Sequence, residues 1–421
     1  MTRNLVGALA LAALAAVPGQ AQSDGASYAI VDATIVPVVG ARIERGTVVI
    51  QNGRIAAVGG NVSAPAGAER IDGRGLFVYP GLIDAGSHLG LTEIGSVPGG
   101  IDLNEIGDFN PHNVALTAVN PHSELIPTVR VNGITSVITS ASGGQIQGYA
   151  ALIDLAGWTP DEMAIQPMAA MVMSYPRTFG GRFRRARQEQ GDPAERLNRQ
   201  VRELRDYLRN ARAYAQIERP AKTDLAFEAM RPIFGGRVPT VFDVETPEQI
   251  RGVFALADEF ELRVILRGAS GAWELADSIA ARKIPVIVGP TTRPPEGDDP
   301  YDAVYANPGV LVRAGITIAF QTDDAADSRN LPYNAALATA YGLDPDEALR
   351  ALTINPARIF GVADRLGSIE VGKVANLQLT TGDPLDVRTV VRQVFVRGDP
   401  TDMLDRHTRL YEKFRARPEH R

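Results

Sequence analysis

The chain has 421 residues, of which 45% are hydrophobic and 22% are charged, as is usual for a soluble globular protein. Its net charge of −6 provides no basic surface for nucleic acid. It contains no cysteine, which excludes disulfide bonds, cysteine ligands for zinc and cysteine nucleophiles.

Residues 1–22 have the pattern of a secretory signal peptide. Arg3 is followed by an apolar run over residues 5–17, which is too short to span a bilayer, and small residues lead to a cleavage position after Ala21. We therefore expect an exported protein, periplasmic or secreted, with no membrane contact once this segment is removed.

Both ends of the remaining chain predict β-strands. Residues 28–78 contain short runs rich in β-branched residues, and Asn52-Gly53 between two of them is a strong signal for a β-hairpin. Residues 362–400 contain further runs of this kind. Neither set is large enough to bury a core alone, so we expect both to form one small β-sandwich, followed by a charged tail over 401–421.

Between these ends, residues 79–361 predict an α/β fold, a TIM (β/α)8 barrel. Eight strand candidates occur, among them "ITSVITSA", "YAALIDLA", "MAAMVMSY", "TVFDV" and "LRVILRG", and from residue 240 onward strands alternate with helices. Thr246 and Gln249 form a capping box at the start of one helix, which should end at Phe260. A segment at 182–219 interrupts the alternation and predicts an arginine-rich helical insertion.

Catalytic groups of such barrels lie where strands end and loops begin. Several charged or polar residues occupy those positions, and we expect them to line a substrate site: Asp84, His88, Asp243, Arg267, Asp323 and Asp324.

The chain resembles the amidohydrolase superfamily, and within it the exported, imidazolonepropionase-like branch. The stretches that carry the resemblance are "YPGLIDAGSHLGL", "TDDAADSRNLPYNAALA" and "GLDPDEALRALTINPARIFGVADRLGSIEVGKVANLQLTTGDPLD". The resemblance implies a metal-binding barrel flanked by a β-sandwich from both chain ends. It also implies hydrolysis of amide-like or ester-like bonds by a metal-activated water.

The family's metal ligands are only partly present. His88 matches the second histidine of a first-strand His-x-His pair, and Gly86 replaces the first. Asp323 matches the aspartate of the eighth strand, Asp243 stands where the fifth-strand histidine belongs, and the sixth strand offers Arg267 instead of histidine. We therefore predict a degenerate metal site.

Two states of this site stay open from the sequence. His88, Asp243 and Asp323 could hold a single divalent metal, and their oxygen-rich set would favour harder ions than zinc. Alternatively no metal binds, because an inward-pointing Arg267 would repel a cation and pair with Asp243 or Asp323.

The function expected from the resemblance is hydrolysis of carbon–nitrogen bonds other than peptide bonds. In that case Asp323 acts as general base and proton shuttle, and His88 acts as a ligand or electrophile. Metal-free activation of water by His88 and Asp323 is a variant of this hypothesis. The alternative is an inactive homologue that acts as a binding or partner subunit. We expect a small amide- or ester-like substrate, no nucleic acid, and either a homo-oligomer or pairing with an intact relative.

Overall fold

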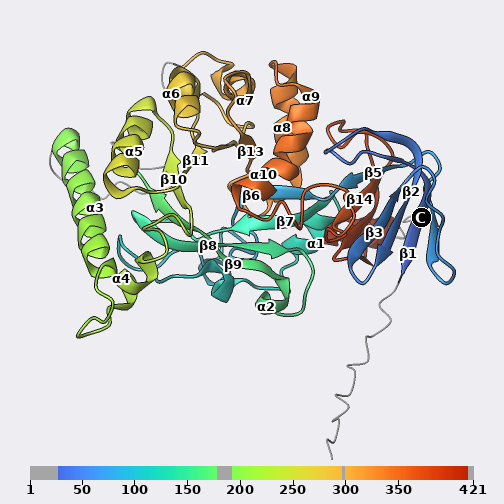
Figure 1. Ribbon diagram of the computed structural model, residues 1–421, viewed down its shortest axis with the longest axis horizontal. Coiled ribbons are helices and arrows are strands. Elements are labelled where there is room, and N and C mark those ends of the chain that lie inside the picture. Colours follow the sequence, from blue (N-terminus) through green and yellow to red (C-terminus); the bar gives the residue numbers. More distant parts are fainter. Residues whose placement is uncertain (1–26, 178–191, 296–298, 416–421) are drawn as a thin grey trace, which may run out of the picture.

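A computed structural model describes residues 27–177, 192–295 and 299–415. The predicted signal peptide lies outside these residues. In Figure 1 the described chain forms a barrel with its helices on the left and a smaller β-domain on the right.

A nearly closed barrel of eight strands forms the larger body of the described chain. The strands follow one another in space in chain order. Their bounds are β6 (Leu82–Ser87), β7 (Ile134–Thr139), β8 (Ile146–Asp154), β9 (Ala164–Ser174), β10 (Thr240–Val244), β11 (Val264–Gly268), β12 (Val286–Val288) and β13 (Ile318–Phe320). The first and last strands meet where the Thr322 and Asp323 amides donate to the Gly86 carbonyl, at 3.2 and 2.9 Å. All eight predicted strands are present in this barrel.

The strand directions differ from those of a TIM barrel. β8 is antiparallel to both β7 and β9, whereas the other neighbouring pairs in the sheet are parallel. Only residues 140–145 join β7 to β8, and 155–163 join β8 to β9. A parallel crossover needs about a dozen residues or more, so these connections can only reverse the chain. The parallel order that the predicted TIM (β/α)8 barrel implies is therefore wrong at β8.

Helices cover the outside of the barrel (Figure 1). They are α1 (Leu125–Arg130), α2 (Pro160–Met163), α3 (Pro193–Ala215), α4 (Leu225–Met230), α5 (Pro247–Phe260), α6 (Ala276–Ala281), α7 (Ala303–Arg313), α8 (Leu331–Ala340), α9 (Pro345–Ala351) and α10 (Ile354–Ile359). The predicted capping box of α5 is confirmed, because Thr246 accepts from the Gln249 amide while the Gln249 side chain accepts from the Thr246 amide.

Two short helices, not one long helix, lie between Asp344 and Gly361. Asp344 caps α9, as its side chain accepts from the amides of Asp346 and Glu347. The break falls after Leu352, four residues before Pro356. The proline ring would clash with the Leu352 carbonyl and has no N–H to donate to it, so Pro356 disfavours a continuous helix at this point.

The two chain ends share one sheet beside the barrel. It contains β1 (Tyr28–Ile35), β2 (Ile43–Gln51), β3 (Arg54–Gly59), β4 (Glu69–Asp72), β5 (Phe77–Pro80), β14 (Leu377–Thr380), β15 (Val391–Val396) and β16 (Asp399–Pro400). β14 pairs with β5, and β5 with β1, so the predicted pairing of the ends is confirmed. The Asn52-Gly53 turn has positive φ angles of 51° and 74°, as its hairpin requires. The division into two sandwich layers stays a prediction.

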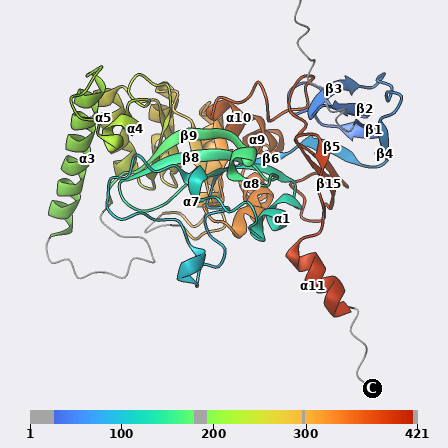
Figure 2. The same cartoon turned by 90° about the horizontal axis from the view of Figure 1, so that it is seen from below.

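The arginine-rich insertion contributes α3, whose apolar stripe packs against the body. Leu204, Leu208 and Ala211 are fully buried. Near the other end, α11 (Arg406–Arg415) projects from the molecule and has no buried residue (Figure 2).

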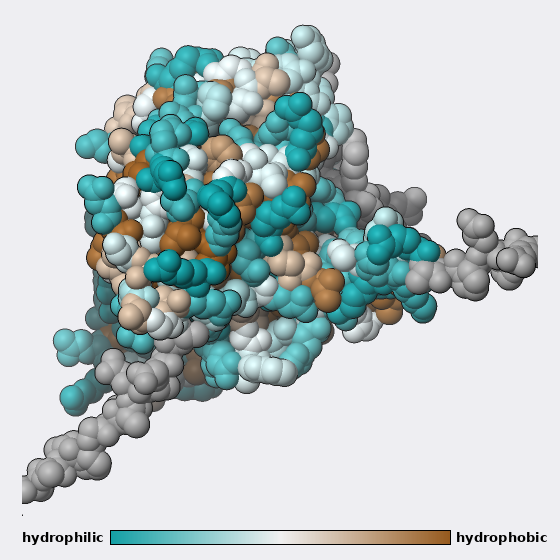
Figure 3. All heavy atoms as spheres, turned by 90° about the vertical axis from the view of Figure 1, so that its right-hand side faces the viewer, coloured by the Kyte–Doolittle hydropathy of each residue, from teal (hydrophilic) through white to brown (hydrophobic). Residues whose placement is uncertain are grey.

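Hydrophilic side chains cover most of the face shown in Figure 3, and hydrophobic residues form smaller groups between them. Across the described residues, no helix combines the length and apolarity needed to cross a bilayer.

Candidate functional site

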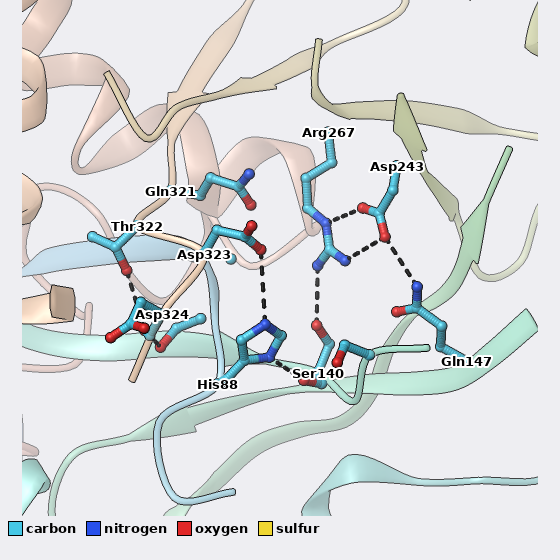
Figure 4. Close-up of polar contacts among 12 residues, drawn as sticks. His88, Ser140, Gln147, Asp243, Arg267, Gln321, Thr322, Asp323 and Asp324 are labelled. Carbon is cyan, nitrogen blue, oxygen red and sulfur yellow. Dashed lines mark hydrogen bonds and ion pairs between the residues drawn. The ribbon is translucent and has the colours of Figure 1, made fainter. Parts of the chain in front are cut away.

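The polar side chains of the site converge at one end of the barrel (Figure 4). They come from the carboxyl ends of parallel strands and from the first residues of the antiparallel β8. Because β8 runs the other way, its beginning lies beside the ends of β7 and β9.

His88 follows β6 and has a defined tautomer. Its Nδ1 lies 2.7 Å from the Ser140 carbonyl oxygen. A carbonyl only accepts, so Nδ1 carries the hydrogen and Nε2 is the basic nitrogen of the neutral ring. Nε2 faces Asp323 Oδ1 at 3.8 Å, and only 14% of the side chain is exposed. This separation is too long for a direct hydrogen bond but allows one water to contact both groups.

Asp323 follows β13 with a left-handed backbone, φ 54°. Such a conformation is unfavourable for a non-glycine residue, and here the amide is held by the Gly86 carbonyl. The carboxylate is about half exposed at the barrel mouth, but the protein around it removes part of its hydration and raises its pKa. The protonated form of His88 and the guanidinium of Arg267 oppose this rise, because positive charge favours the ionised carboxylate.

Arg267 and Asp243 form a bidentate ion pair across neighbouring strands. The two residues are directly paired in the β10–β11 register. Arg267 Nε lies 2.5 Å from Asp243 Oδ1, Nη2 lies 3.0 Å from Oδ2, and Nη1 donates to Ser140 Oγ at 3.0 Å. Arg267 is 5% exposed. Burial alone would lower its pKa, but Asp243 reverses this effect and raises the pKa, so the guanidinium stays charged.

Four further polar residues of the site were not predicted from the sequence. Gln147 and Ser174 both donate to Asp243 Oδ2, at 3.1 and 3.3 Å. Ser140 accepts hydrogen bonds from both His88, through its carbonyl oxygen, and Arg267, through its hydroxyl oxygen. Gln321 is buried and donates to the Gly289 carbonyl at 2.9 Å. Ser140, Ser174 and Gln321 lie at or next to the carboxyl end of an apolar strand, which is the signal that could have identified them. Gln147 lies at the start of β8, where this signal does not apply.

At Gly86, where the resemblance implies a histidine, the space for a side chain is already occupied. A Cβ built on Gly86 would lie 2.2 Å from Gln321 Oε1 and 3.1 Å from Gln321 Cβ. Gln321 therefore fills the volume that a side chain at position 86 would need.

Two predicted site residues face elsewhere. Asp84 is fully buried and accepts from the hydroxyl and amide of Thr322 at 2.5 and 3.2 Å, so it joins β6 to the last strand. Burial raises its pKa to about 7, although the hydrogen bonds oppose this. The Asp324 carboxylate accepts from the Asp327 amide at 2.8 Å, which starts the turn that follows. The structure brings together His88, Asp243, Arg267 and Asp323, and not these two.

The residues at the mouth do not fit the metal that the resemblance implies. Both oxygens of Asp243 are engaged by the guanidinium of Arg267, a fixed positive charge beside the remaining donors. That leaves His88 and Asp323, whereas catalytic zinc sites use three protein ligands. Within residues 27–177, 192–295 and 299–415, no group of three or more histidine, aspartate or glutamate side chains is arranged to hold a metal ion.

Known proteins resemble this chain over most of its length or over a short part of it. A model of the amidohydrolase family matches residues 304–401. Amidohydrolase tasK of Hapsidospora irregularis is 25% identical over 410 residues, covering 86% of this chain and 41% of that protein. Imidazolonepropionase of Porphyromonas gingivalis is 42% identical over 79 residues, 18% of this chain and 19% of that protein. The chain thus spans about two fifths of the first relative's length, and its match to the second is local.

Among solved structures, an amidohydrolase from Thermotoga maritima MSB8 superimposes with a TM-score of 0.79 at 27% identity. The match covers 89% of this chain and 99% of that one. Molinate hydrolase shares the fold with a TM-score of 0.57 at 17% identity, covering 90% of this chain and 95% of that one.

Proposed function

Because the chain is an amidohydrolase-like protein, we propose that it hydrolyses small substrates with carbon–nitrogen bonds other than peptide bonds, using His88 and Asp323 to activate water. The proposal depends on the arrangement of these two side chains at the barrel mouth, where His88 Nε2 and Asp323 Oδ1 are 3.8 Å apart.

The tautomer of His88 supports a role in proton transfer. With Nδ1–H bound to the Ser140 carbonyl, the Nε2 lone pair faces the same space as the Asp323 carboxylate. A water between them can donate one hydrogen to each acceptor, which orients its oxygen for attack. The raised pKa of Asp323 suits a group that must accept a proton and release it again.

Arg267 supplies the fixed positive charge of the site. Three of the five N–H groups of its guanidinium are bound to Asp243 and Ser140, which leaves two for a substrate oxygen. Donors held in place before the reaction stabilise an oxyanion without reorganisation. We therefore assign Arg267 to the carbonyl oxygen of the substrate, while Asp243, Gln147 and Ser174 hold it in place.

The proposed reaction balances with these residues alone. The water oxygen attacks the carbonyl carbon, and its proton passes to Asp323. Negative charge develops on the carbonyl oxygen beside Arg267. When the carbon–nitrogen bond breaks, Asp323 returns the proton to the leaving nitrogen.

We propose that the ancestral metal site is degenerate and that no step of the reaction is routed through a metal. The occupied oxygens of Asp243 and the Gln321 side chain beside Gly86 support this view. The structure provides no observation that favours the inactive alternative, which remains an outcome of the tests below.

The experiment compares wild-type protein with Asp323→Asn on N-acyl amino acids, cyclic ureides and anilides. Loss of the general base should lower kcat/KM by about 10²–10⁴-fold. Asp327→Asn is the matched control, since Asp327 is an exposed aspartate in the same loop whose carboxylate, among the described residues, accepts a hydrogen bond from Asn330. If Asp323→Asn is as active as the control, the assignment is wrong, and no turnover of any amide or ester would favour a binding subunit.

We also propose that the protein is exported and belongs to the imidazolonepropionase-like branch. The charged, apolar and small-residue parts of residues 1–22 support export, and the local similarity to imidazolonepropionase supports the branch. Mass spectrometry of the N-terminus of the mature protein would test the cleavage after Ala21. A homo-oligomer, or pairing with an intact relative, remains our proposal for its assembly, to be tested by light scattering.

A further inference from the structure

A large cavity lies at the opposite end of the barrel from His88 and Asp323. Its volume is about 860 Å³, within the usual range for pockets that take small organic molecules. It is lined by residues just before or at the starts of β11, β12 and β13, and by residues of α10. We call it the basal cavity.

The inner surface of the basal cavity is apolar. Ile265, Ile284, Ile316 and Ile359 line it and are each at most 8% exposed. Ile265 and Ile359 also belong to the cluster that fills the barrel interior. An apolar part of a ligand would therefore contact side chains that are already fixed by packing.

The rim of the basal cavity carries an excess of positive charge. Among its lining residues, Arg263, Arg282, Lys283 and Arg358 are cationic and Asp258 is acidic. Both oxygens of Asp258 are bound by Arg282, at 2.6 and 2.9 Å.

The other three cations of the rim, Arg263, Lys283 and Arg358, form no ion pair with any described residue. The side chains of Arg263 and Lys283 form no hydrogen bond or ion pair with any described residue, although both are exposed. Arg358 makes one long hydrogen bond, 3.4 Å, to the neutral side chain of Asn355, and its charge acts on Glu370, a carboxylate that is already paired with Lys373. In a chain of net charge −6, two cations without any partner among the described residues and a third without an ion pair, all around one apolar cavity, are unexpected unless an anion belongs there.

We propose that the basal cavity binds a small amphiphilic anion, a monocarboxylate with an aliphatic or aromatic body. The carboxylate lies against Arg263, Lys283 and Arg358, and the body lies on the isoleucine surface. This site is separate from the proposed catalytic site and does not depend on it, because the two occupy opposite ends of the parallel strands.

Isothermal titration with octanoate tests the proposal on the full chain. Octanoate should bind the wild type, whereas Arg263→Gln/Lys283→Gln should weaken it at least 10-fold. Arg219→Gln/Lys222→Gln is the matched control, since it removes one exposed arginine and one exposed lysine away from the cavity. It should bind as the wild type does, and circular dichroism should show that all variants are folded.

Two further probes separate the contributions of charge and apolar surface. Octanamide, which is uncharged, and inorganic phosphate, which has no apolar body, should each bind at least 10-fold more weakly than octanoate. Octanoate binding should persist in Asp323→Asn, as expected of a site that does not depend on the catalytic carboxylate. The proposal is overturned if octanoate fails to bind at millimolar concentration, if the cavity variant binds as the control does, if Asp323→Asn abolishes binding, or if either probe matches octanoate.

Discussion

Replacing Arg267 with methionine would leave the Asp243 carboxylate without its cation inside the barrel mouth. Arg267 is 5% exposed, and the Asp243 side chain is 31% exposed. Removing one member of a buried ion pair costs about 3–5 kcal/mol, because the other charge stays behind without compensation. Asp243 keeps hydrogen bonds from Gln147 and Ser174, so we expect the lower end, about 3 kcal/mol. With roughly 0.8 kcal/mol/K of unfolding entropy for a chain of this length, Tm should fall by about 4 °C.

Urea unfolding and thermal scans, both followed by circular dichroism, measure this loss. Arg282→Met is the matched control, because Arg282 makes a similar bidentate pair with Asp258 at the surface, with side chains 37% and 61% exposed. An exposed pair contributes about 0–1 kcal/mol, so the control should be nearly neutral. Arg267→Met/Asp243→Asn should recover much of the lost stability, since no charge is then left unpaired. If Arg267→Met is no more destabilising than Arg282→Met, the ion pair does not maintain the barrel mouth as argued.

Three further predictions concern the same end of the barrel. Gly86→Ala should destabilise the protein by about 1–3 kcal/mol, since its Cβ would meet Gln321 Oε1 at 2.2 Å. Adding Gln321→Ala to the same chain should restore part of this stability. Urea unfolding of the double variant that shows no such recovery would contradict the proposed contact. The pKa of Asp84 rises to about 7 on folding, so between about pH 4 and pH 7 the folded state binds more protons than the unfolded state. The contribution of Asp84 to the free energy of unfolding therefore decreases as the pH rises toward 7. Asp84→Asn should flatten that dependence, and unfolding free energies at pH 5 and 7.5 that change as in the wild type would disprove it. Dialysis against a chelator should change kcat/KM less than twofold, and lost activity that Zn²⁺ or Mn²⁺ restores would show that a metal is used.

Much of the fold followed from local patterns. Each barrel strand is a short apolar run bounded by turn residues, and the capping box at Thr246 and Gln249 is confirmed. These features depend on residues a few positions apart, so the sequence displays them directly. The direction of β8 was missed, although six connecting residues between β7 and β8 already exclude a parallel crossover. Loop length, which the sequence also contains, would have corrected the prediction.

For the site, too, local sequence patterns predicted some features, whereas others depend on contacts between distant residues. The sequence alone placed Asp243, Arg267, His88 and Asp323 at strand ends, and the family resemblance implied that Gly86 stands in place of a histidine. Only the tertiary structure decided which of them meet. Arg267 pairs with Asp243 because the β10–β11 register sets them opposite each other, and Gln321 fills the space at Gly86 from 235 residues further along the chain. Such contacts depend on barrel closure and strand register, which arise from the packing of the whole chain and leave no local pattern in the sequence.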